Sequence, residues 1–427
     1  MGDEGLFSDL KEWVDSIPLV DIHCHINGEK PAAEDPKEII FYHYIATELM
    51  SAGAPPKAFS PNISFEEAMK LTLPYFKMIR NTSTYWCLMK ILRDLYGFEE
   101  NEINEKNWRR IQELILSHVD EENWYRRVLK TTNFEKGFLT FRYEEKIPKF
   151  DPEYYTGALR IEPLITRLNK DDVKALEKAV NASVESINDF EEALSLLFKK
   201  FHGRVVAVTA SIRPEEDFTE PNREKADESI RKRIFGSKLN ESGMLHLRSY
   251  AINLVLSLAE EYNLPVQLMI GVRRPVAGAS PPDYAIVGFE TKFLLSLCQL
   301  FHKFRDVSFD IFLANKLQSH ELTVIAKNYP NVHVSGYWWY VFYPTIIQEF
   351  LLERLQMLPQ NKINGFFSDA YVVEWVYGKA SLVRLQIAEV LTRMVKNGYY
   401  DKDLAKNIAE NLLLHNPKKL YLARQSS

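Results

Sequence analysis

The stretch Leu19-Val20-Asp21-Ile22-His23-Cys24-His25 is a short apolar run that ends in two histidines separated by one residue. On a β-strand, residues i and i+2 point to the same face, so we expect His23 and His25 side by side while Cys24 points away. Neutral imidazole is a good ligand for divalent transition metals. The stretch therefore predicts the start of a metal site. Ordinary surface or core histidines are the alternative that a single His-X-His pattern leaves open.

Short β-type runs alternate with amphipathic helical patterns along most of the chain. The predicted strands lie at about 17–23, 137–141, 158–161, 204–208, 266–270, 307–312, 332–335 and 363–367. The helical patterns lie at 6–16, 36–51, 64–80, 83–96, 106–118, 121–131, 170–182, 187–201, 222–234, 242–262, 288–304, 316–328, 345–356, 371–397 and 402–414. An eightfold alternation indicates parallel strands with crossover helices, and its closed form is a TIM-type (β/α)8 barrel of the α/β class. An open doubly wound sheet is the alternative, but no Gly-X-Gly-X-X-Gly follows the first strand.

The connection after the first strand contains only helical patterns. We therefore expect the barrel to be formed by residues 1–25 and 132–427, and residues 26–131 to form a helical insertion. Because catalytic residues of such barrels lie at the C-terminal ends of the strands, an insertion in the first βα connection is placed to cap that face.

The composition restricts the class of partner. The 427 residues are 46% hydrophobic with a net charge of −5 and no Lys/Arg block, which argues against a nucleic-acid partner. The three cysteines form no Cys-X-X-Cys pair and cannot all pair with one another, which fits a reducing compartment. No secretory signal pattern opens the sequence, and no apolar run reaches the length of a membrane span. We expect a cytoplasmic protein with a small-molecule substrate and no membrane partner.

A carboxylate follows the last predicted strand, in Phe367-Ser368-Asp369-Ala370. Taken alone, Asp369 could be a helix N-cap, since Ser-Asp before a helix is a common start signal. Closure of a barrel makes the first and last strands neighbours. We therefore predict that His23, His25 and Asp369 hold one divalent metal ion.

These residues belong to a set of motifs that runs through nearly the whole chain. The first-strand motif resembles that of the amidohydrolase superfamily, and the complete set, in this order, resembles the uronate isomerases. The motifs are Val20–His25, Tyr42-His43-Tyr44, Ala158-Leu159-Arg160-Ile161-Glu162-Pro163, Leu268-Met269-Ile270-Gly271-Val272, His320-Glu321-Leu322, Gly336-Tyr337-Trp338-Trp339, Ser368-Asp369-Ala370 and Asn416-Pro417. The resemblance implies an aldose–ketose isomerase of carbohydrate metabolism with one divalent metal, usually zinc. Its substrates would be D-glucuronate (to D-fructuronate), D-galacturonate (to D-tagaturonate) or a related sugar acid.

An aldose–ketose isomerisation needs a base, a group that stabilises the developing oxyanion and a holder for the sugar acid's carboxylate. Asp369 is our predicted base as well as a metal ligand. By resemblance, His43 and Tyr44 contact the substrate, with Tyr44 as a hydrogen-bonding acid. Ordinary packing on an amphipathic helix is the alternative for both.

Four further residues are predicted to bind the substrate. Arg160 could fork onto a carboxylate, or form an ion pair with Glu162 on the same face. Trp338 and Trp339 could form a stacking wall for a sugar ring, and strand alternation would turn one to the barrel mouth and the other to the core. Lys379 is expected to be a polar contact, with a solvated helix position as the alternative.

The metal site departs from the family pattern at the fifth strand, where many uronate isomerases have a histidine. The residue here is Met269, and a thioether is a poor zinc ligand among nitrogen and oxygen donors. We expect weaker metal binding, with Gln267 on the same side as a possible oxygen donor.

The carboxylate site also departs from the family pattern, which often has arginine two residues after the last aspartate. Here that residue is Tyr371, and a phenol cannot replace a bidentate guanidinium. We expect the substrate carboxylate to bind Arg160, Arg273 or Arg274, and a different sugar acid is a real alternative.

Two other functions remain open. Strand four (Val208-Thr209-Ala210) has no lysine that could be carbamylated for a two-metal centre, and strand six has no histidine, so the sequence disfavours a hydrolase. A mononuclear metal-dependent hydrolase or decarboxylase of the same superfamily is the first alternative. A catalytically inactive barrel that binds a sugar acid or a protein is the second. We also expect a homo-oligomer, for which aromatic residues of the insertion are candidate contacts, although that subdomain's own core explains them more simply (Trp86, Trp108, Trp124 and Tyr125).

Overall fold

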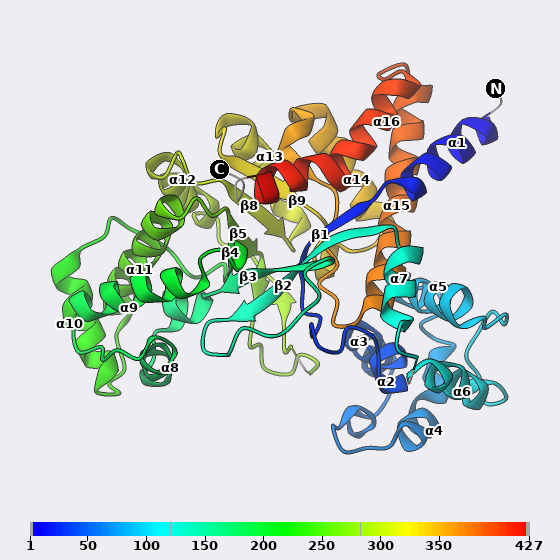
Figure 1. The fold of residues 1–427 in the computed structure, drawn as a ribbon, viewed down its shortest axis with the longest axis horizontal. Helices are drawn as coiled ribbons and strands as arrows, with labels where there is room; N and C mark the ends of the chain where they lie inside the picture. Colours follow the sequence, from blue (N-terminus) through cyan, green and yellow to red (C-terminus); the bar gives the residue numbers. More distant parts are fainter. Residues whose placement is uncertain (1–2, 120, 282, 424–427) are drawn as a thin grey trace.

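Eight parallel strands form one sheet that curls into a barrel (Figure 1). The computed structural model describes residues 3–119, 121–281 and 283–423, so the ends of the predicted barrel unit, residues 1–2 and 424–427, lie outside the described residues. In spatial order the strands are β1 (Leu19–Cys24), β2 (Phe134–Arg142), β3 (Tyr155–Arg160), β4 (Val205–Ile212), β5 (Val266–Ile270), β8 (Phe309–Leu313), β9 (Val332–Ser335) and β10 (Ile363–Asn364). Every neighbouring pair in this order is parallel, which confirms the predicted TIM-type barrel.

The barrel closes where the first and last strands meet. Regular pairing of β10 ends at Asn364, and the chain then runs on towards the end of β1. There the Asp369 amide donates to the His23 carbonyl at 2.9 Å, and the His25 amide donates to the Ala370 carbonyl at 2.8 Å. These two backbone hydrogen bonds make the seam at the C-terminal end of the strands, where active sites of such barrels lie.

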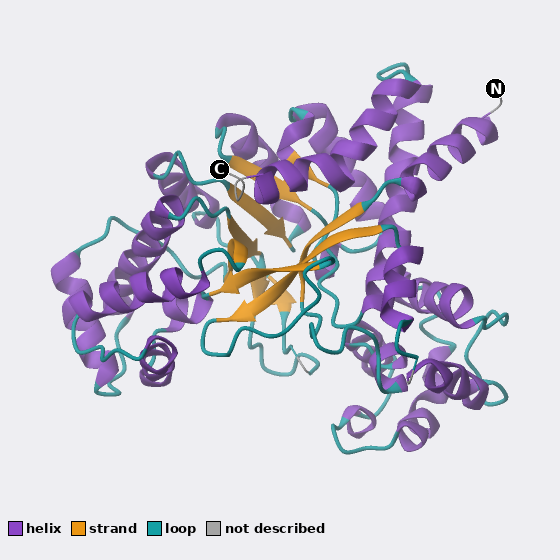
Figure 2. Ribbon diagram, in the orientation of Figure 1, coloured by secondary structure: helices purple, strands orange, loops and turns teal. Residues whose placement is uncertain are grey.

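Helices surround the strands, as Figure 2 shows. Their apolar residues recur every three or four positions, as along α9, so that one stripe of each helix packs on the barrel. The surrounding helices are α1 (Asp3–Ser16), α8 (Lys170–Val180), α9 (Ile187–Phe201), α10 (Arg223–Ile234), α11 (Glu241–Glu261), α12 (Phe293–Lys303), α13 (Ser319–Asn328), α14 (Pro344–Met357), α15 (Val373–Lys396) and α16 (Lys402–Glu410). Within the described residues, no helix combines the length and apolarity needed to cross a membrane.

The described residues between β1 and β2 form six α-helices, in the segment coloured blue to cyan in Figure 1. The segment is anchored by Glu374 of α15, a buried carboxylate that accepts hydrogen bonds from Trp124 Nε1 (2.8 Å) and Tyr96 OH (3.1 Å). Trp108 is also buried, whereas Trp86 is 38% exposed, so most of these aromatics belong to the protein's own core. The six helices are α2 (Pro36–Ile40), α3 (His43–Ser51), α4 (Phe65–Phe76), α5 (Ser83–Tyr96), α6 (Trp108–Val119) and α7 (Trp124–Thr131).

The single helix predicted over 36–51 is wrong, because the chain breaks it at Phe41 and Tyr42. Tyr42 has an extended ψ of 139° and its ring stacks on Trp375 at 4.2 Å between centroids. This buried contact overrides the local helix preference, which extends without a breaker through the stretch. The break places His43 and Tyr44 in the first turn of α3.

A short antiparallel hairpin was not predicted. It pairs β6 (Val272–Arg273) with β7 (Ile286–Val287), and α12 accordingly begins at Phe293 rather than at residue 288. The three cysteines are buried free thiols.

Candidate functional site

A cavity of about 220 Å³ lies at the C-terminal ends of the strands. Its lining is mostly polar and includes residues from β1, β3, β4 and β5, from the loops after β9 and β10, and from the start of α3. The lining residues are His23, His25, His43, Arg160, Glu162, Thr209, Ser211, Met269, Arg274, Asp283, Trp338, Trp339, Asp369 and Tyr371.

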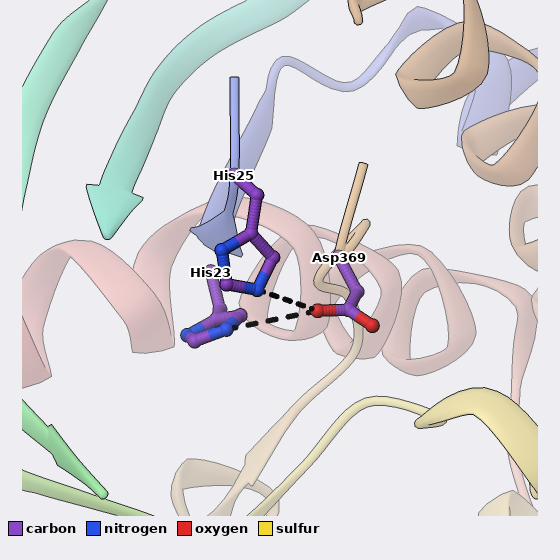
Figure 3. A group of neighbouring side chains, drawn as sticks. All are labelled: His23, His25 and Asp369. Carbon is purple, nitrogen blue, oxygen red and sulfur yellow. Dashed lines mark ion pairs between the residues drawn. The ribbon is translucent and has the colours of Figure 1, made fainter. Parts of the chain in front are cut away.

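His23 of β1 and His25, the residue directly after β1, face the carboxylate that follows β10 (Figure 3). His25 Nε2 lies 3.2 Å from Asp369 Oδ1, and His23 Nε2 lies 3.7 Å from the same oxygen. The imidazole rings meet edge to face with 5.0 Å between centroids. The structure thus brings the three predicted metal ligands together, and the seam of the barrel is what joins them.

This group fits a divalent metal ion. One donor atom from each of the three residues lies within 4.8 Å of the others. Two ligand atoms of a tetrahedral zinc ion, each at about 2.0–2.2 Å from it, lie roughly 3.3 Å apart. The two imidazoles lie 3.2 Å and 3.7 Å from Asp369 Oδ1, close to that spacing. His23 is 2% exposed, and neither of its ring nitrogens has a hydrogen-bond partner among the described residues. A bound ion would satisfy one of these nitrogens.

The protonation states of the group suit a metal site. Burial lowers the pKa of His23 to about 3, so its imidazole is neutral near pH 7, as a metal ligand must be. Burial by itself would raise the pKa of Asp369, but the hydrogen bond from His25 and the nearby charge of Lys379 hold it below its ordinary value. Asp369 is therefore ionised.

The other oxygen of Asp369 faces two hydrogen-bond donors. Trp338 Nε1 donates to Oδ2 at 3.2 Å, and Tyr44 OH donates to it at 3.4 Å. Burial raises the pKa of Tyr44 well above its ordinary value, so the phenol keeps its proton. His43 lines the cavity, and burial, with the nearby charge of Lys379, lowers its pKa to about 3. A neutral imidazole and a protonated phenol therefore flank the carboxylate.

The backbone of Asp369 is in the left-handed region, with φ of 51°, a conformation that non-glycine residues adopt only when their surroundings hold it. Tyr42 OH donates to the Asp369 carbonyl at 3.0 Å. Lys379 Nζ donates to the Ser368 carbonyl at 2.7 Å and to Tyr42 OH at 2.9 Å. Lys379 is 2% exposed, so the structure places this predicted substrate contact behind the cavity wall, where it supports the loop that carries Asp369.

Both tryptophans line the cavity, but Trp338 is 3% exposed and belongs to the buried apolar cluster of the barrel, whereas Trp339 packs against that cluster and is only partly buried. They follow the end of β9 at Ser335, and Trp339 has a positive φ of 29°, so strand alternation does not apply to them. The ring of Trp339 is parallel to that of Tyr44, with 6.0 Å between centroids.

Arg160 forms the ion pair with Glu162 that was one of its two predicted interactions. Its guanidinium lines the cavity, and its Nε lies 2.8 Å from each oxygen of Glu162. The positive charge of Arg160 is therefore largely balanced before any ligand binds.

The two arginines beyond β5 differ in their surroundings. Arg273 is not among the residues that line the cavity, and it forms an ion pair with Glu290 at 2.7 Å. Arg274 lines the cavity and has longer contacts, 3.4 Å to Ser211 Oγ and 3.9 Å to Asp283. Arg274 is thus the less engaged guanidinium of the cavity.

Several residues of the site were missed or placed differently by sequence reasoning. Tyr42 adjoins the predicted His43-Tyr44 pair, but only its contact with Lys379 shows its role. Asp283 lies in a loop without a helical or strand pattern. Tyr371 stands where the family pattern often has an arginine, and its ring stacks on that of His25 with 5.2 Å between centroids. Gln267, expected to offer an oxygen to the cavity, is fully buried and does not line it.

Comparison with known proteins supports the predicted resemblance. No family model matches the chain. The uronate isomerase of Thermotoga neapolitana is 20% identical over 459 residues, which cover 97% of this chain and 96% of that protein. The uronate isomerase structure from Thermotoga maritima has a TM-score of 0.90 at 16% identity and covers 99% of both chains. The glucuronate isomerase structure from Caulobacter crescentus has a TM-score of 0.88 at 17% identity and covers 99% of this chain and 94% of that one. The fold and the resemblance to uronate isomerases are confirmed.

Proposed function

Because this chain is related over nearly its whole length to uronate isomerases, we propose that it is an aldose–ketose isomerase acting on hexuronates. The reactions would convert D-glucuronate to D-fructuronate and D-galacturonate to D-tagaturonate, or act in the same way on a related sugar acid. The observation that carries the proposal is the convergence of His23, His25 and Asp369 in a polar cavity that also presents Tyr44 and two guanidiniums.

We propose that His23, His25 and Asp369 hold one zinc ion. When bound, a divalent ion supplies positive charge that favours the anionic form of the sugar oxygens during isomerisation. The side chain that Met269 adds to the cavity is a soft thioether, so the protein offers three good ligands and we expect weaker binding than with four.

Asp369 and Tyr44 can carry the proton transfers. We propose that the ionised Asp369 takes the proton from C2 of the open-chain sugar and returns it to C1. The protonated Tyr44 donates its proton to the oxygen at C1 and recovers one from the hydroxyl at C2. The net result moves one hydrogen from C2 to C1 and one from O2 to O1, which is the aldose–ketose conversion.

We propose that Arg274 binds the substrate carboxylate, in place of the arginine that Tyr371 replaces. Its long contacts to Ser211 and Asp283 leave the guanidinium available for a bidentate carboxylate. Arg160, whose charge Glu162 already balances, would instead donate to a sugar hydroxyl.

The test is an isotope-exchange experiment on the zinc-loaded protein. D-Glucuronate, D-galacturonate and a panel of other sugar acids are incubated in D2O, and NMR follows the ketose product and exchange of the C2 hydrogen. We expect exchange and ketose formation with at least one acid, and their loss in Asp369→Asn. The matched control, Glu290→Gln, changes an exposed carboxylate outside the cavity and should keep full activity. A protein that binds zinc but exchanges the C2 hydrogen of no sugar acid would contradict the proposal, and a hydrolysis or decarboxylation product would favour the alternative.

The homo-oligomeric state and cytoplasmic location stay predictions.

A further inference from the structure

A buried polar chain runs beneath the metal site and begins in the C-terminal segment of the protein. The helical segment Lys418–Leu422 contacts β4 and carries Tyr421 into the interior of the barrel. Tyr421 is 1% exposed, and its ring meets Phe138 edge to face with 5.1 Å between centroids. A phenol at this depth needs hydrogen-bond partners, and it finds them on two strands.

Asp310 of β8 determines the direction of the hydrogen bonds within this row of buried polar side chains. Tyr421 OH donates to Asp310 Oδ2, and the same carboxylate accepts from Ser335 Oγ and from Asn364 Nδ2 (3.1 Å). Burial raises the pKa of Asp310 to about 6, so at neutral pH it is ionised and can only accept. Tyr421 therefore donates its hydroxyl proton to Asp310, and its phenol oxygen accepts a hydrogen bond from a second neighbour.

That neighbour is Gln267 of β5. Its Nε2 donates to Tyr421 OH at 3.2 Å and to the Ile22 carbonyl at 2.8 Å. Both partners are acceptors, so a flipped amide would place its oxygen against two oxygens and lose both bonds. The orientation of Gln267 is thus fixed, with Oε1 turned away from Tyr421 and Ile22.

Gln267 Oε1 and the ring nitrogens of His23 are buried polar atoms that have no hydrogen-bond partner within the described part of the chain. The amide of Gln267 lies beside the backbone of His23, because its Nε2 donates to the carbonyl of Ile22, the residue directly before His23. An unsatisfied acceptor and an unsatisfied imidazole this deep in the protein each cost free energy, and one bond between them removes both costs.

We propose that Gln267 Oε1 accepts the hydrogen of His23 Nδ1 and so holds His23 in the tautomer whose Nε2 lone pair faces Asp369. Gln267, with Tyr421 and Asp310 behind it, is then a positioning group for a metal ligand. Metal-binding histidines generally donate their second ring N–H to such a partner. The inference rests on the proposed metal site of the isomerase and does not depend on which sugar acid is the substrate.

The test compares three variants by two measurements that need no substrate. Gln267→Met removes the acceptor at similar volume, Tyr421→Phe removes only the hydroxyl that orients the amide, and Tyr155→Phe is the matched control. Tyr155 carries a buried hydroxyl for which the described residues offer no partner, and it lines a separate surface pocket. The measurements are ¹⁵N chemical shifts of labelled histidine in the metal-free protein and zinc affinity by competition with a chelator.

We expect the wild-type protein and Tyr155→Phe to show His23 as a single tautomer with a protonated Nδ1. In Gln267→Met the tautomers should mix, and zinc affinity should fall by about 10–100-fold, with a smaller fall in Tyr421→Phe. Unchanged zinc affinity and an unchanged tautomer in Gln267→Met would overturn the inference. If Gln267→Met does not fold, unchanged zinc affinity and an unchanged tautomer in Tyr421→Phe would overturn the inference instead. Failure of the isomerase proposal would appear differently, as zinc binding and a single tautomer without exchange at C2 of any sugar acid.

Discussion

Substitution of Asp310 by asparagine should change how the stability of the protein depends on pH. Asp310 is fully buried at the centre of the polar chain beneath the metal site, and burial raises its pKa from 3.8 to about 6. Asparagine has nearly the same shape and keeps an oxygen for Tyr421 and Asn364, but it does not titrate. The difference in unfolding free energy between wild type and Asp310→Asn therefore isolates the ionisation of this one carboxyl group.

The sign and size follow from the proton balance of the two states. Below about pH 4 the carboxyl is protonated in both the folded and the unfolded protein, so ionisation has no effect. Between pH 4 and 6 the unfolded chain loses the proton while the folded protein keeps it, so the stability of the wild type falls as pH rises. At about 1.36 kcal/mol per pH unit, the fall amounts to about 3 kcal/mol and is complete above pH 6.

Urea denaturation at half-unit steps from pH 3 to pH 7.5 measures this effect, with the midpoint and the slope recorded at each step. The wild type should lose about 3 kcal/mol relative to Asp310→Asn across the range. Glu260→Gln, at an exposed helix position, is the control and should differ from the wild type by the same amount at every pH. A constant difference between wild type and Asp310→Asn would refute the reasoning, because it would mean that the folded protein does not penalise the ionised form.

Four other outcomes are expected. Gly378→Ala should destabilise the protein by about 1–3 kcal/mol, because the added Cβ would lie 2.8 Å from Ile91 Cδ1; an unchanged Tm would contradict this. Arg274→Met should raise the KM for the sugar acid by about 10–100-fold, because it removes a charge-assisted hydrogen bond that contributes about 1.5–3 kcal/mol. A larger rise in KM from Arg160→Met would reverse the roles assigned to the two arginines. Glu374→Leu should lower the free energy of unfolding by about 2–4 kcal/mol in urea denaturation, since it removes the acceptor of three buried donors, Trp124 Nε1, Tyr96 OH and the Ala33 amide; a loss below 1 kcal/mol would argue against that anchor. Removal of metal by a chelator should lower the Tm and added zinc should restore it, whereas an unaffected Tm would argue against a resident ion.

The parts of the fold that the sequence predicts well are those with a clear period. Helices α5 (Ser83–Tyr96) and α9 (Ile187–Phe201) and strands β5 (Val266–Ile270) and β9 (Val332–Ser335) have the predicted bounds. Each is an apolar or amphipathic run with polar or turn-forming neighbours, so local preference and tertiary packing agree. The pairing of His23 and His25 with Asp369 followed in the same way, since barrel closure fixes which strand ends meet.

Tertiary contacts decided the features that were not predicted. Tyr42 leaves the helical conformation because its ring packs on Trp375 and its hydroxyl bonds Lys379, neither of which a local pattern reveals. The cavity-facing position of Arg274 depends on a loop between β6 and β7 that has no periodic signal. Trp338 was expected from strand alternation to be either in the core or at the mouth, but it lies beyond the end of its strand, where alternation carries no information.

The seam between β1 and the chain after β10 also has a consequence for biosynthesis. The Asp21 carboxylate accepts hydrogen bonds from the amide and hydroxyl of Ser368, 347 positions later in the sequence. At about 5–20 residues per second, a ribosome needs roughly 20 to 70 seconds to connect these two partners. For that interval the nascent chain carries the two histidines but lacks the aspartate that completes the set, so the proposed metal site can reach its full affinity only after residue 369 has been synthesised.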